Sequence, residues 1–287
     1  MLFMFHCKAD YSFTIATGPE NATYHQVGGS LDLLDRIAVK TVSTKGSQEN
    51  IQLLKDKKVD IALVQLDIYN NLLASDKELE KNIKILLPLY SEEVHLLASK
   101  NIRSIKDLKR KRVCLGDAES GTRGTAQIII DVYKLTDKFK MVQCGFEDGL
   151  KMLNAKRLDA LFLVAGAPVK SLKKLKSKNI HLVPFQGKGY KFLTAGYFSY
   201  VKKSLNKKTY QWLKKKVKTL AVESAIITRR DLPVKSLKFL ARKIIRERKK
   251  LATKHEKWKQ VDYKEMKKFY SKNKEHFHKA SVSIFSH

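Results

Sequence analysis

The sequence predicts an α/β protein built on parallel sheets. Strand-like and helix-like segments alternate through residues 13–170, which is the pattern of βαβ units. Two apolar runs, residues 59–67 and 158–164, are nearly continuous, as in parallel strands buried on both faces. The chain has 287 residues, 43% of them hydrophobic, so it is long enough for one large domain or two of ordinary size.

The first part of the chain predicts strands at residues 13–18, 39–44 and 59–67. A loop at residues 21–30 leads into a helical run at 31–37, and Ser47 is the expected N-cap of a helix that starts at Gln48. A helix near residues 68–74 follows. Strands at residues 83–90 and 94–98 then form a long extended stretch that is able to cross between domains.

The middle of the chain repeats this alternation. Ser104 is expected to cap a short helix at residues 104–108. The further segments expected are a strand at 113–115, a helix at 128–133, a strand at 139–142, a helix at 147–154, and strands at 158–164 and 180–185. The tail has helical periodicity at 207–227, 234–250 and 263–274. The predicted organisation is the first part of lobe 1 at 10–99, lobe 2 at 100–195 and a helical region at 196–287 that packs back on lobe 1.

The loop at residues 116–125 has the chemistry of an anion site. The first turn of a helix leaves N–H groups without intrahelical partners, and the helix dipole adds partial positive charge there. Ser120, Thr122 and Thr125 add hydroxyl groups, glycines let a ligand approach the backbone, and Arg123 is able to pair with a carboxylate. The alternative interpretation is a capped helix with no ligand.

The net charge of +30 is unevenly distributed. Residues 1–200 hold 31 Lys and Arg against 21 Asp and Glu, whereas residues 201–287 hold 27 against 7. Such a tail raises nucleic acid or an anionic membrane surface as a partner. The lysines follow the outer positions of expected helices, and no nucleic-acid-binding motif accompanies them, so a solvated face is favoured and no nucleic acid is expected.

The three cysteines, Cys7, Cys114 and Cys144, lack metal-ligand spacing. Cys114 and Cys144 lie in apolar runs and are expected to be small buried side chains, with no disulfide framework and no metal. The apolar start of the chain is too short for a usual signal peptide, so the chain is either cytosolic or begins inside a longer signal. No run approaches the ~20 apolar residues of a membrane-spanning helix.

Ligands of open α/β sheets collect beyond the carboxyl ends of the strands. Five strand-end loops, at residues 17–24, 46–50, 65–67, 116–125 and 165–168, are therefore candidates for one shared site.

These loops, with the segments between them, resemble a known family. The motifs that carry the resemblance are, in chain order, Thr17-Gly18, Thr23-Tyr24, Gly28-Gly29, residues 44–50, 60–67, 89–95 and 104–108, Gly116 with residues 120–123, and residues 159–168. In this order they resemble the TAXI family of TRAP-transporter solute receptors, over about residues 13–170.

The resemblance implies a type II periplasmic-binding-protein fold, with two α/β lobes and a ligand cleft. The basic helical C-terminal extension, which the charge and the helical periodicity of the tail predict, is a departure from the family. It further implies a periplasmic, monomeric receptor that binds a small organic anion such as glutamate or a dicarboxylate and delivers it to a membrane permease. No catalytic role and no cofactor are implied.

The resemblance also assigns ligand-binding residues. They are Gly18, Thr23, Tyr24, Gly46, Ser47, Asn50, Gln65, Ser120, Gly121, Thr122, Arg123 and Gly166. Ser120, Thr122 and adjacent N–H groups are expected to hold a ligand carboxylate, while Tyr24 walls the pocket and Ser47 and Gln65 contact the other polar end of the ligand.

Some segments depart from the family pattern. Pro19-Glu20-Asn21 replaces a glycine-rich loop, and His25-Gln26 replaces a second tyrosine and proline. Asp117 and Glu119 precede the expected anion site, and they favour a ligand with an amino group, such as an amino acid.

Two other classes of function stay open. One is an enzyme of the same bilobal fold that makes pyrimidine precursors, for which His25 and His95 are the only histidines near the site. The other is a nucleic-acid or anionic-surface binder that uses the basic tail.

Overall fold

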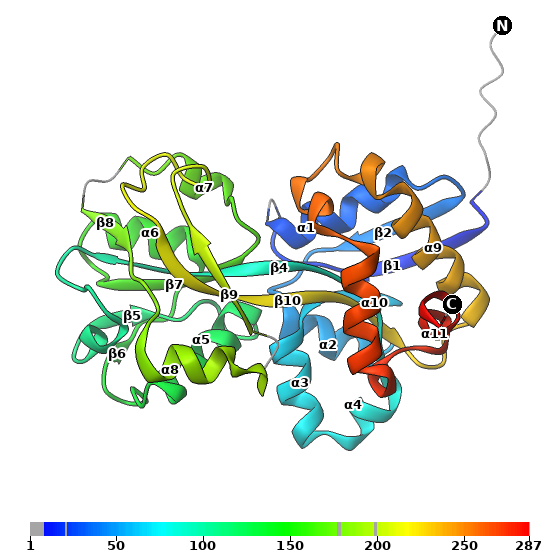
Figure 1. The fold of residues 1–287 in the computed structure, drawn as a ribbon, viewed down its shortest axis with the longest axis horizontal. Coiled ribbons are helices and arrows are strands. Elements are labelled where there is room, and N and C mark those ends of the chain that lie inside the picture. The colour runs from blue at the N-terminus through cyan, green and yellow to red at the C-terminus, as the bar shows by residue number, and fades with distance from the viewer. Residues whose placement is uncertain (1–8, 21, 177–178, 198–199, 287) are drawn as a thin grey trace, which may run out of the picture. The chain divides into compact units, whose positions relative to one another are not determined.

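A computed structural model describes residues 9–20, 22–176, 179–197 and 200–286 of the chain (Figure 1). It divides into two compact units, of which the second comprises Gln65–Asn70 and Ser91–Glu223. The rest of the chain forms the first unit. Two long strands, β4 (Ile83–Ser99) and β10 (Val217–Arg229), contribute residues to both units. β4 is one continuous strand, where the sequence predicts two.

The first unit is built around β1 (Tyr11–Ala16). This strand lies between β2 (Ile37–Val42) and β3 (Ile61–Gln65) and is parallel to both, with Ile15 opposite Thr41 on one side and Ile61 on the other. The strand order continues through β10 to β4. The helices after β2 and β3 are α2 (Ser47–Lys55), α3 (Leu66–Ser75) and α4 (Lys77–Asn82).

The first helix, α1 (Thr23–Gly29), occupies the stretch where the sequence predicts a loop. A short 3-10 turn at Ser30–Leu33 and the start of β2 at Ile37 replace the expected helix at residues 31–37. The sequence did not predict α1 because the helix contains Gly28, and glycine has a low helix propensity. This glycine is needed for packing, since a Cβ at Gly28 would lie only 2.5 Å from Thr17 Cγ2.

The second unit has a mixed sheet and not the purely parallel one predicted. β5 (Arg112–Cys114) is parallel to β7 (Ala160–Ala165) and to β6 (Lys140–Met141). β4 is antiparallel to β7 and to β8 (Ile180–Leu182), and β9 (Tyr200–Leu205) is antiparallel to β10. Its helical segments are a 3-10 turn at Ile105–Leu108, α5 (Gly121–Val132), α6 (Phe146–Asn154), α7 (Lys170–Lys173), α8 (Gly187–Phe192) and a π-helical turn at Leu193–Tyr197. The Ser104 cap of the first turn is confirmed, as a full capping box with Asp107.

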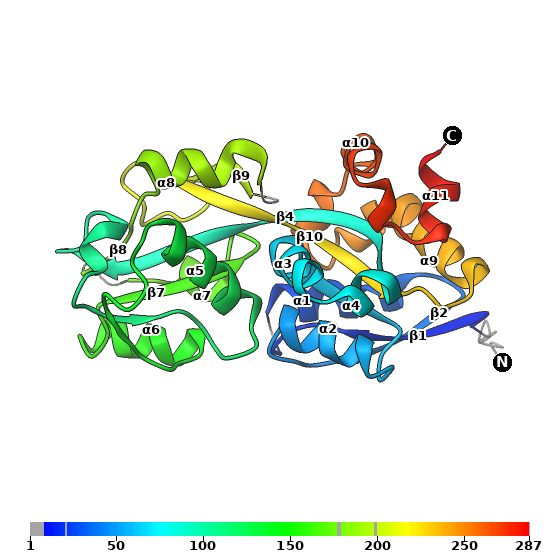
Figure 2. The ribbon, with the colours of Figure 1, turned by 90° about the horizontal axis from the view of Figure 1, so that it is seen from below.

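Helices cover both faces of this sheet, and Figures 1 and 2 show α6 and α8 on opposite sides of β7. The two faces bury alternate residues of each strand. In β7, Phe162 and Val164 pack in the cluster that contains Ile129 of α5, whereas Leu161 and Leu163 pack in the cluster that contains the α6 residues Leu150 and Leu153. Burial on both faces explains why this strand is an unbroken apolar run in the sequence.

In the part of the tail that the structure describes, two of the three predicted helices are present, and a further α-helix lies after them. α9 (Val234–Leu251) and α10 (Tyr263–Lys272) lie close to the predicted ranges, and α11 (Lys279–Phe285) follows. The helix expected at residues 207–227 is wrong, because this stretch ends the turn after β9 and forms most of β10. The spacing of its short apolar runs is compatible with a helix and with a strand. Residues 217–222 form a strand because they pair with β9.

Residues after Ser224 pack within the first unit. Trp258 is 1% exposed, and its indole Nε1 donates to Ser30 Oγ at 2.8 Å. Phe277 forms a parallel bridge with Ile85, and Ser281 Oγ donates to the main-chain oxygen of Leu86 at 2.6 Å. These contacts make the tail part of the unit's core.

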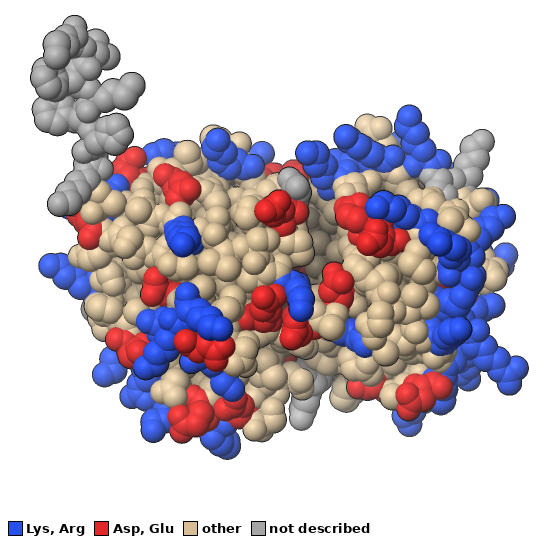
Figure 3. All heavy atoms as spheres, turned by 180° about the vertical axis from the view of Figure 1, so that it is seen from behind, with Lys and Arg blue, Asp and Glu red and all other residues tan. Residues whose placement is uncertain are grey.

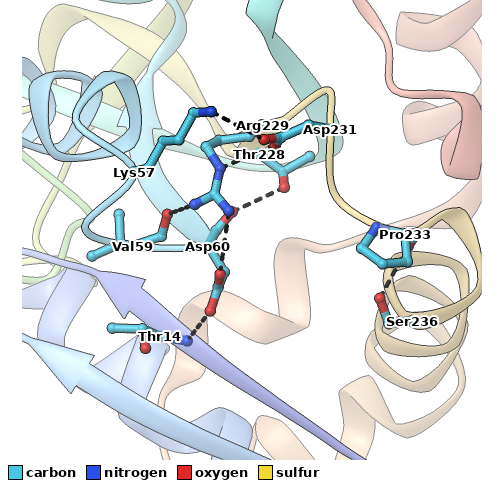
Figure 4. A network of polar contacts seen from close by, with 9 residues as sticks. All are labelled: Thr14, Lys57, Val59, Asp60, Thr228, Arg229, Asp231, Pro233 and Ser236. Carbon is cyan, nitrogen blue, oxygen red and sulfur yellow. Dashed lines mark hydrogen bonds and ion pairs between the residues drawn. The ribbon is translucent and has the colours of Figure 1, made fainter.

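Each unit uses an aspartate to begin its buried parallel strand. Asp60 accepts a hydrogen bond from Thr14 N at 2.8 Å, and its own N–H donates to Thr14 O (Figure 4). Arg229 pairs with the same carboxylate at 3.7 Å, donates to the main-chain oxygen of Val59 and lies 3.1 Å from Asp231. This network ties the middle of β1 and the start of β3 to the end of β10.

Asp159 has the equivalent role in the second unit. It accepts from Arg112 N at 2.8 Å, and the Arg112 guanidinium donates to both of its carboxylate oxygens, at 3.0 and 2.8 Å. The hydrogen bonds from Arg112 lower the pKa of Asp159. The two aspartates therefore have the same function in the sequences Val59-Asp60-Ile61 and Leu158-Asp159-Ala160.

Cys114 and Cys144 form a disulfide, which corrects the expectation of two buried thiols. Their Cα atoms lie 6.1 Å apart, although 30 positions separate them in the chain. Cys114 ends β5, and Cys144 lies two residues before α6. The bond therefore ties the strand that leads to α5 to the segment that leads to α6. Cys7 lies outside the described residues.

Within the described ranges, no helix is long and apolar enough to cross a membrane. Figure 3 shows basic and acidic side chains mixed over much of one face, with Lys and Arg gathered along the right-hand edge, on the second unit. The second unit includes residues 202–218, a lysine-rich part of the tail that contains no acidic residue.

Candidate functional site

Asn50 connects the strand ends of the first unit. Its side chain is fully buried, and Nδ2 donates to the main-chain oxygens of Thr17 and Leu63, both at 2.6 Å. Its Oδ1 accepts from Thr44 Oγ1 at 2.6 Å. One amide thus joins β1, β3 and the loop after β2 to helix α2. Both the N–H groups and the oxygen of the amide are therefore bonded within the protein. Asn50 holds the strand ends in position.

Gly46 takes the N-cap position of α2, where the sequence predicts Ser47. Gly46 has φ +125°, a conformation that side chains disfavour, and its N–H donates to Thr44 Oγ1 at 3.1 Å. Ser47 is the first residue of the helix and is 1% exposed. The helix therefore begins at the backbone bend of Gly46 and has no serine side chain as its N-cap.

Gly18 and Tyr24 lie together at the end of β1. A Cβ on Gly18 would be 3.3 Å from Tyr24 Cβ, and the Gly18 oxygen accepts from Ser43 Oγ at 3.1 Å. Tyr24 is 7% exposed, and Thr23 is the first residue of α1. The structure thus groups the predicted residues of the first unit around the ends of β1 and β2.

The predicted anion site of the second unit is the start of α5. Ser120 is its N-cap: Ser120 Oγ accepts from Arg123 N at 3.0 Å and donates to the Asp117 oxygen at 2.7 Å. Helix geometry leaves the N–H groups of Gly121 and Thr122 without intrahelical acceptors. The helix dipole concentrates partial positive charge at the same point.

Thr122 fastens this helix start to β7. Its hydroxyl accepts from Val164 N at 3.0 Å and lies 3.4 Å from Val164 O, to which it donates. Gly116, at φ +100°, approaches so closely that a Cβ there would be 2.8 Å from Thr122 Cγ2. The hydroxyl therefore has structural partners, and its predicted contact with a ligand stays a prediction.

Arg123 lies along the loop that precedes α5. Its Nη1 is 3.2 Å from Gln143 Oε1 and 3.5 Å from the main-chain oxygen of Gly116, and it donates to both. The guanidinium thus braces the loop. Gly166, which is buried, follows β7 directly, and the next residue, Ala167, donates its N–H to Glu93 Oε2 at 2.7 Å. The peptide bond between Ala167 and Pro168 is cis.

Gln65 ends β3, is 2% exposed and belongs to the second unit. Two positions later, Asp67 is fully buried and accepts from Thr125 Oγ1 and Tyr200 OH, both at 2.6 Å. Burial raises the pKa of Asp67, and burial also raises the pKa of Tyr200. Sequence reasoning missed this triad. Its one visible signal was an acid at the exit of an otherwise apolar strand.

Both histidines of the enzyme alternative are bonded to hydroxyl groups. His25 Nδ1 lies 3.3 Å from Thr17 Oγ1, and buried His95 Nε2 lies 2.9 Å from Tyr210 OH. Burial raises the pKa of Tyr210, which also accepts from Val169 N at 3.0 Å. His95 and Tyr210 thus hold the loop after β7. Among the described residues, no group of three His, Cys, Asp or Glu side chains has the arrangement of a metal site.

Two solved structures share this architecture. The GluR0 ligand-binding core from Nostoc punctiforme, in complex with L-glutamate, is 18% identical, with a TM-score of 0.52 over 86% of this chain and 98% of that chain. A putative L-cystine ABC transporter from Listeria monocytogenes is 17% identical, with a TM-score of 0.53 over 88% of this chain and 98% of that chain. The class of the fold is therefore the two-lobed α/β fold of periplasmic binding proteins.

The family follows from the sequence itself. The chain belongs to the NMT1-like family, whose model matches residues 15–282. The match does not name the TAXI group, so the finer resemblance stays a prediction.

Proposed function

We propose that this protein is a solute-binding receptor for a small organic anion or amino acid of the glutamate or dicarboxylate type. The observation that carries the proposal is the start of α5, where Ser120 caps the helix and a glycine follows it. The N–H groups of Gly121 and Thr122 and the helix dipole suit a carboxylate. The bonds from Thr122 to Val164 hold these donors in place before a ligand arrives.

The charges beside this site favour a ligand that also carries an ammonium group. Asp117 and Glu119 lie in the turn before α5 and are exposed. These two side chains would repel a ligand that carries only carboxylates. An amino acid has a carboxylate for the start of α5 and an ammonium group for the two acidic side chains. Of the two similar structures, one is a complex with L-glutamate and the other is a putative L-cystine transporter, which agrees with an amino acid.

We further propose that strand-end residues of both units bind ligand. They are Gly18, Thr23, Tyr24, Gly46 and Ser47 of the first unit and Gln65 and Gly166 of the second. Asn50 supports these residues by holding the strand ends, because its amide N–H groups and oxygen bond to other residues of the protein.

We place the receptor outside the cytoplasm, where it would deliver its solute as a monomer to a TRAP-type permease. The disulfide between Cys114 and Cys144 supports this location, because disulfides persist in oxidising compartments and are rare in the cytosol. The family membership and the fold agree with a receptor.

The test is a thermal-shift screen against amino acids and dicarboxylates, followed by calorimetry with the best ligand. A ligand that binds only the folded state must raise the melting temperature. Gly121→Pro then removes one N–H at the first helical position, where proline is tolerated, and Gly121→Ala is the matched control that keeps the N–H.

The expected result is a loss of affinity of about tenfold or more for Gly121→Pro, the value of one hydrogen bond to a charged group. Gly121→Ala should bind like the wild type, and both variants should melt close to it. Equal affinity of the two variants would exclude this N–H from the ligand site. No shift with any small acid would refute the receptor itself.

A further inference from the structure

The second unit contains a cavity of about 700 Å³ whose lining is strongly basic. Five lysines contribute to it, from α8, from β9, and from the start of β10 and the residue before it: Lys191, Lys202, Lys203, Lys216 and Lys218. The other lining residues are Phe185, Gln186, Gly187, Tyr190, Ser204 and Asn206, and none of them is acidic. The volume lies within the range of small-molecule sites.

The β9–β10 hairpin forms one wall of this cavity. The two strands are antiparallel, with Lys218 opposite Ser204 and Leu220 opposite Lys202. Leu220 is fully buried in the unit's core, which anchors the strand that carries Lys218. The lysines of this wall therefore project from a hydrogen-bonded sheet.

The second wall, residues 185–191, is bonded to the first and to α5. Phe185 N donates to the main-chain oxygen of Lys218 at 3.1 Å, and Tyr133 OH donates to the main-chain oxygen of Gln186 at 2.9 Å. Gly189 packs so closely on the Tyr133 ring that a Cβ would lie 2.9 Å from it. Both walls are therefore built by main-chain and ring contacts that do not depend on the lysines.

The positive charge of the cavity lining has no acidic residue near it in the sequence of β9 and the start of β10. Residues 202–218 contain eight lysines and no acidic residue. Like charges gathered at a concave surface create a positive potential that an anion relieves. A single carboxylate or phosphate would neutralise only part of it, so the lining suits a ligand with several negative charges.

We propose that this cavity binds a small polyanion that carries several phosphate groups. Lysine is a compact point charge and binds phosphate, whereas planar recognition of carboxylates is the specialty of arginine, which is absent from the lining. Gln186, Ser204, Asn206 and Tyr190 supply neutral hydrogen-bonding groups beside the charges. This site is separate from the strand-end residues of the proposed solute site and does not depend on that proposal.

The test measures binding of inositol hexakisphosphate and inorganic triphosphate to the full chain by calorimetry at two salt concentrations, with citrate as the carboxylate comparison. The pocket variant is Lys202→Glu with Lys218→Glu. The matched control is Lys207→Glu with Lys208→Glu, which makes the same change of charge at exposed positions of the same hairpin connection, outside the cavity.

The expected result is phosphate binding that weakens with salt, exceeds citrate binding and falls about tenfold in the pocket variant, because two exposed ion pairs are lost and each is worth up to about fivefold. The control variant should change affinity less than about threefold. Equal loss in both variants, or citrate binding as strong as triphosphate binding, would overturn the proposal. Binding to vesicles of anionic phospholipid without binding to the free phosphates would also overturn it, since a surface and not the cavity would then be recognised.

Discussion

Reduction of the Cys114–Cys144 disulfide should destabilise the protein by an amount set by the length of the loop that it closes. The two cysteines are 30 positions apart. In the loop-entropy description, a closed loop of this size stabilises the folded state by about 3.5 kcal/mol at 25 °C. With an unfolding entropy of about 0.6 kcal/mol/K for a chain of this length, the melting temperature should fall by about 6 °C. The fall should double to about 12 °C if the second unit, about half of the chain, unfolds by itself.

The assay combines thiol titration with thermal melting, with and without reductant. The unfolded, non-reduced chain should show one reactive thiol, since two of the three cysteines are bonded, and the reduced chain should show three. The double variant Cys114→Ala, Cys144→Ala is the control, and its melting temperature should not respond to reductant. Three thiols in protein made in an oxidising compartment would refute the pairing. A full release of thiols with no change in melting temperature would refute the entropic reasoning.

Two further predictions concern pH and have opposite signs. Asp159→Asn should cost about 1–3 kcal/mol at pH 7, because hydrogen bonds from Arg112 to a carboxylate are lost. These bonds lower the folded-state pKa of Asp159, so the wild-type advantage is complete above the unfolded pKa of about 4 and should shrink as urea titrations move to pH 3 and below. An advantage that does not change with pH would contradict this. Burial raises the folded-state pKa of Asp67, so the wild type should lose stability as pH rises from about 4 through that raised pKa, and Asp67→Asn should gain on it over the same interval. Parallel stability curves for these two proteins would show that Asp67 does not titrate differently on folding.

Much of the fold could be predicted because it is encoded in short stretches. The unbroken apolar run that became β7 indicates a strand covered on both faces, and the two clusters packed against it are the reason. The Ser104 cap and the helix start after Ser120 depend on contacts within four residues, so both can be predicted from the sequence. The same holds for α6 and α9, whose apolar spacing is helical throughout.

Glycine and cysteine gave the misleading signals. Gly28 and Gly46 are equivalent in a sequence, yet one permits close packing inside a helix and the other bends the backbone before one. Cys114 and Cys144 stand in apolar surroundings that describe burial equally well. Their pairing depends on the distance between β5 and the loop before α6, which no local pattern contains.

Part of the candidate site was equally hidden. The sequence identified the residues at the strand ends, because the carboxyl ends of parallel strands are where loops converge. It could not show that the Asn50 amide is fully used by Thr17, Leu63 and Thr44, or that the Thr122 hydroxyl is bonded to Val164. Those assignments change the proposed role of both side chains from contact with a ligand to support of the backbone that contacts it.

The sequence by itself determined the α/β class, the approximate strands and helices of the first 170 residues and the loops that a ligand is proposed to meet. Only the tertiary structure decided that residues 200–205 and 217–229 are strands, that Cys114 pairs with Cys144, that Asp67 is held by Thr125 and Tyr200, and that five lysines line one cavity. The physical reason is the sequence separation of the residues that interact. Helix starts and buried strands depend on residues that are close along the chain. Strand pairing, disulfides and charge clusters depend on residues that only the folded sheet brings together.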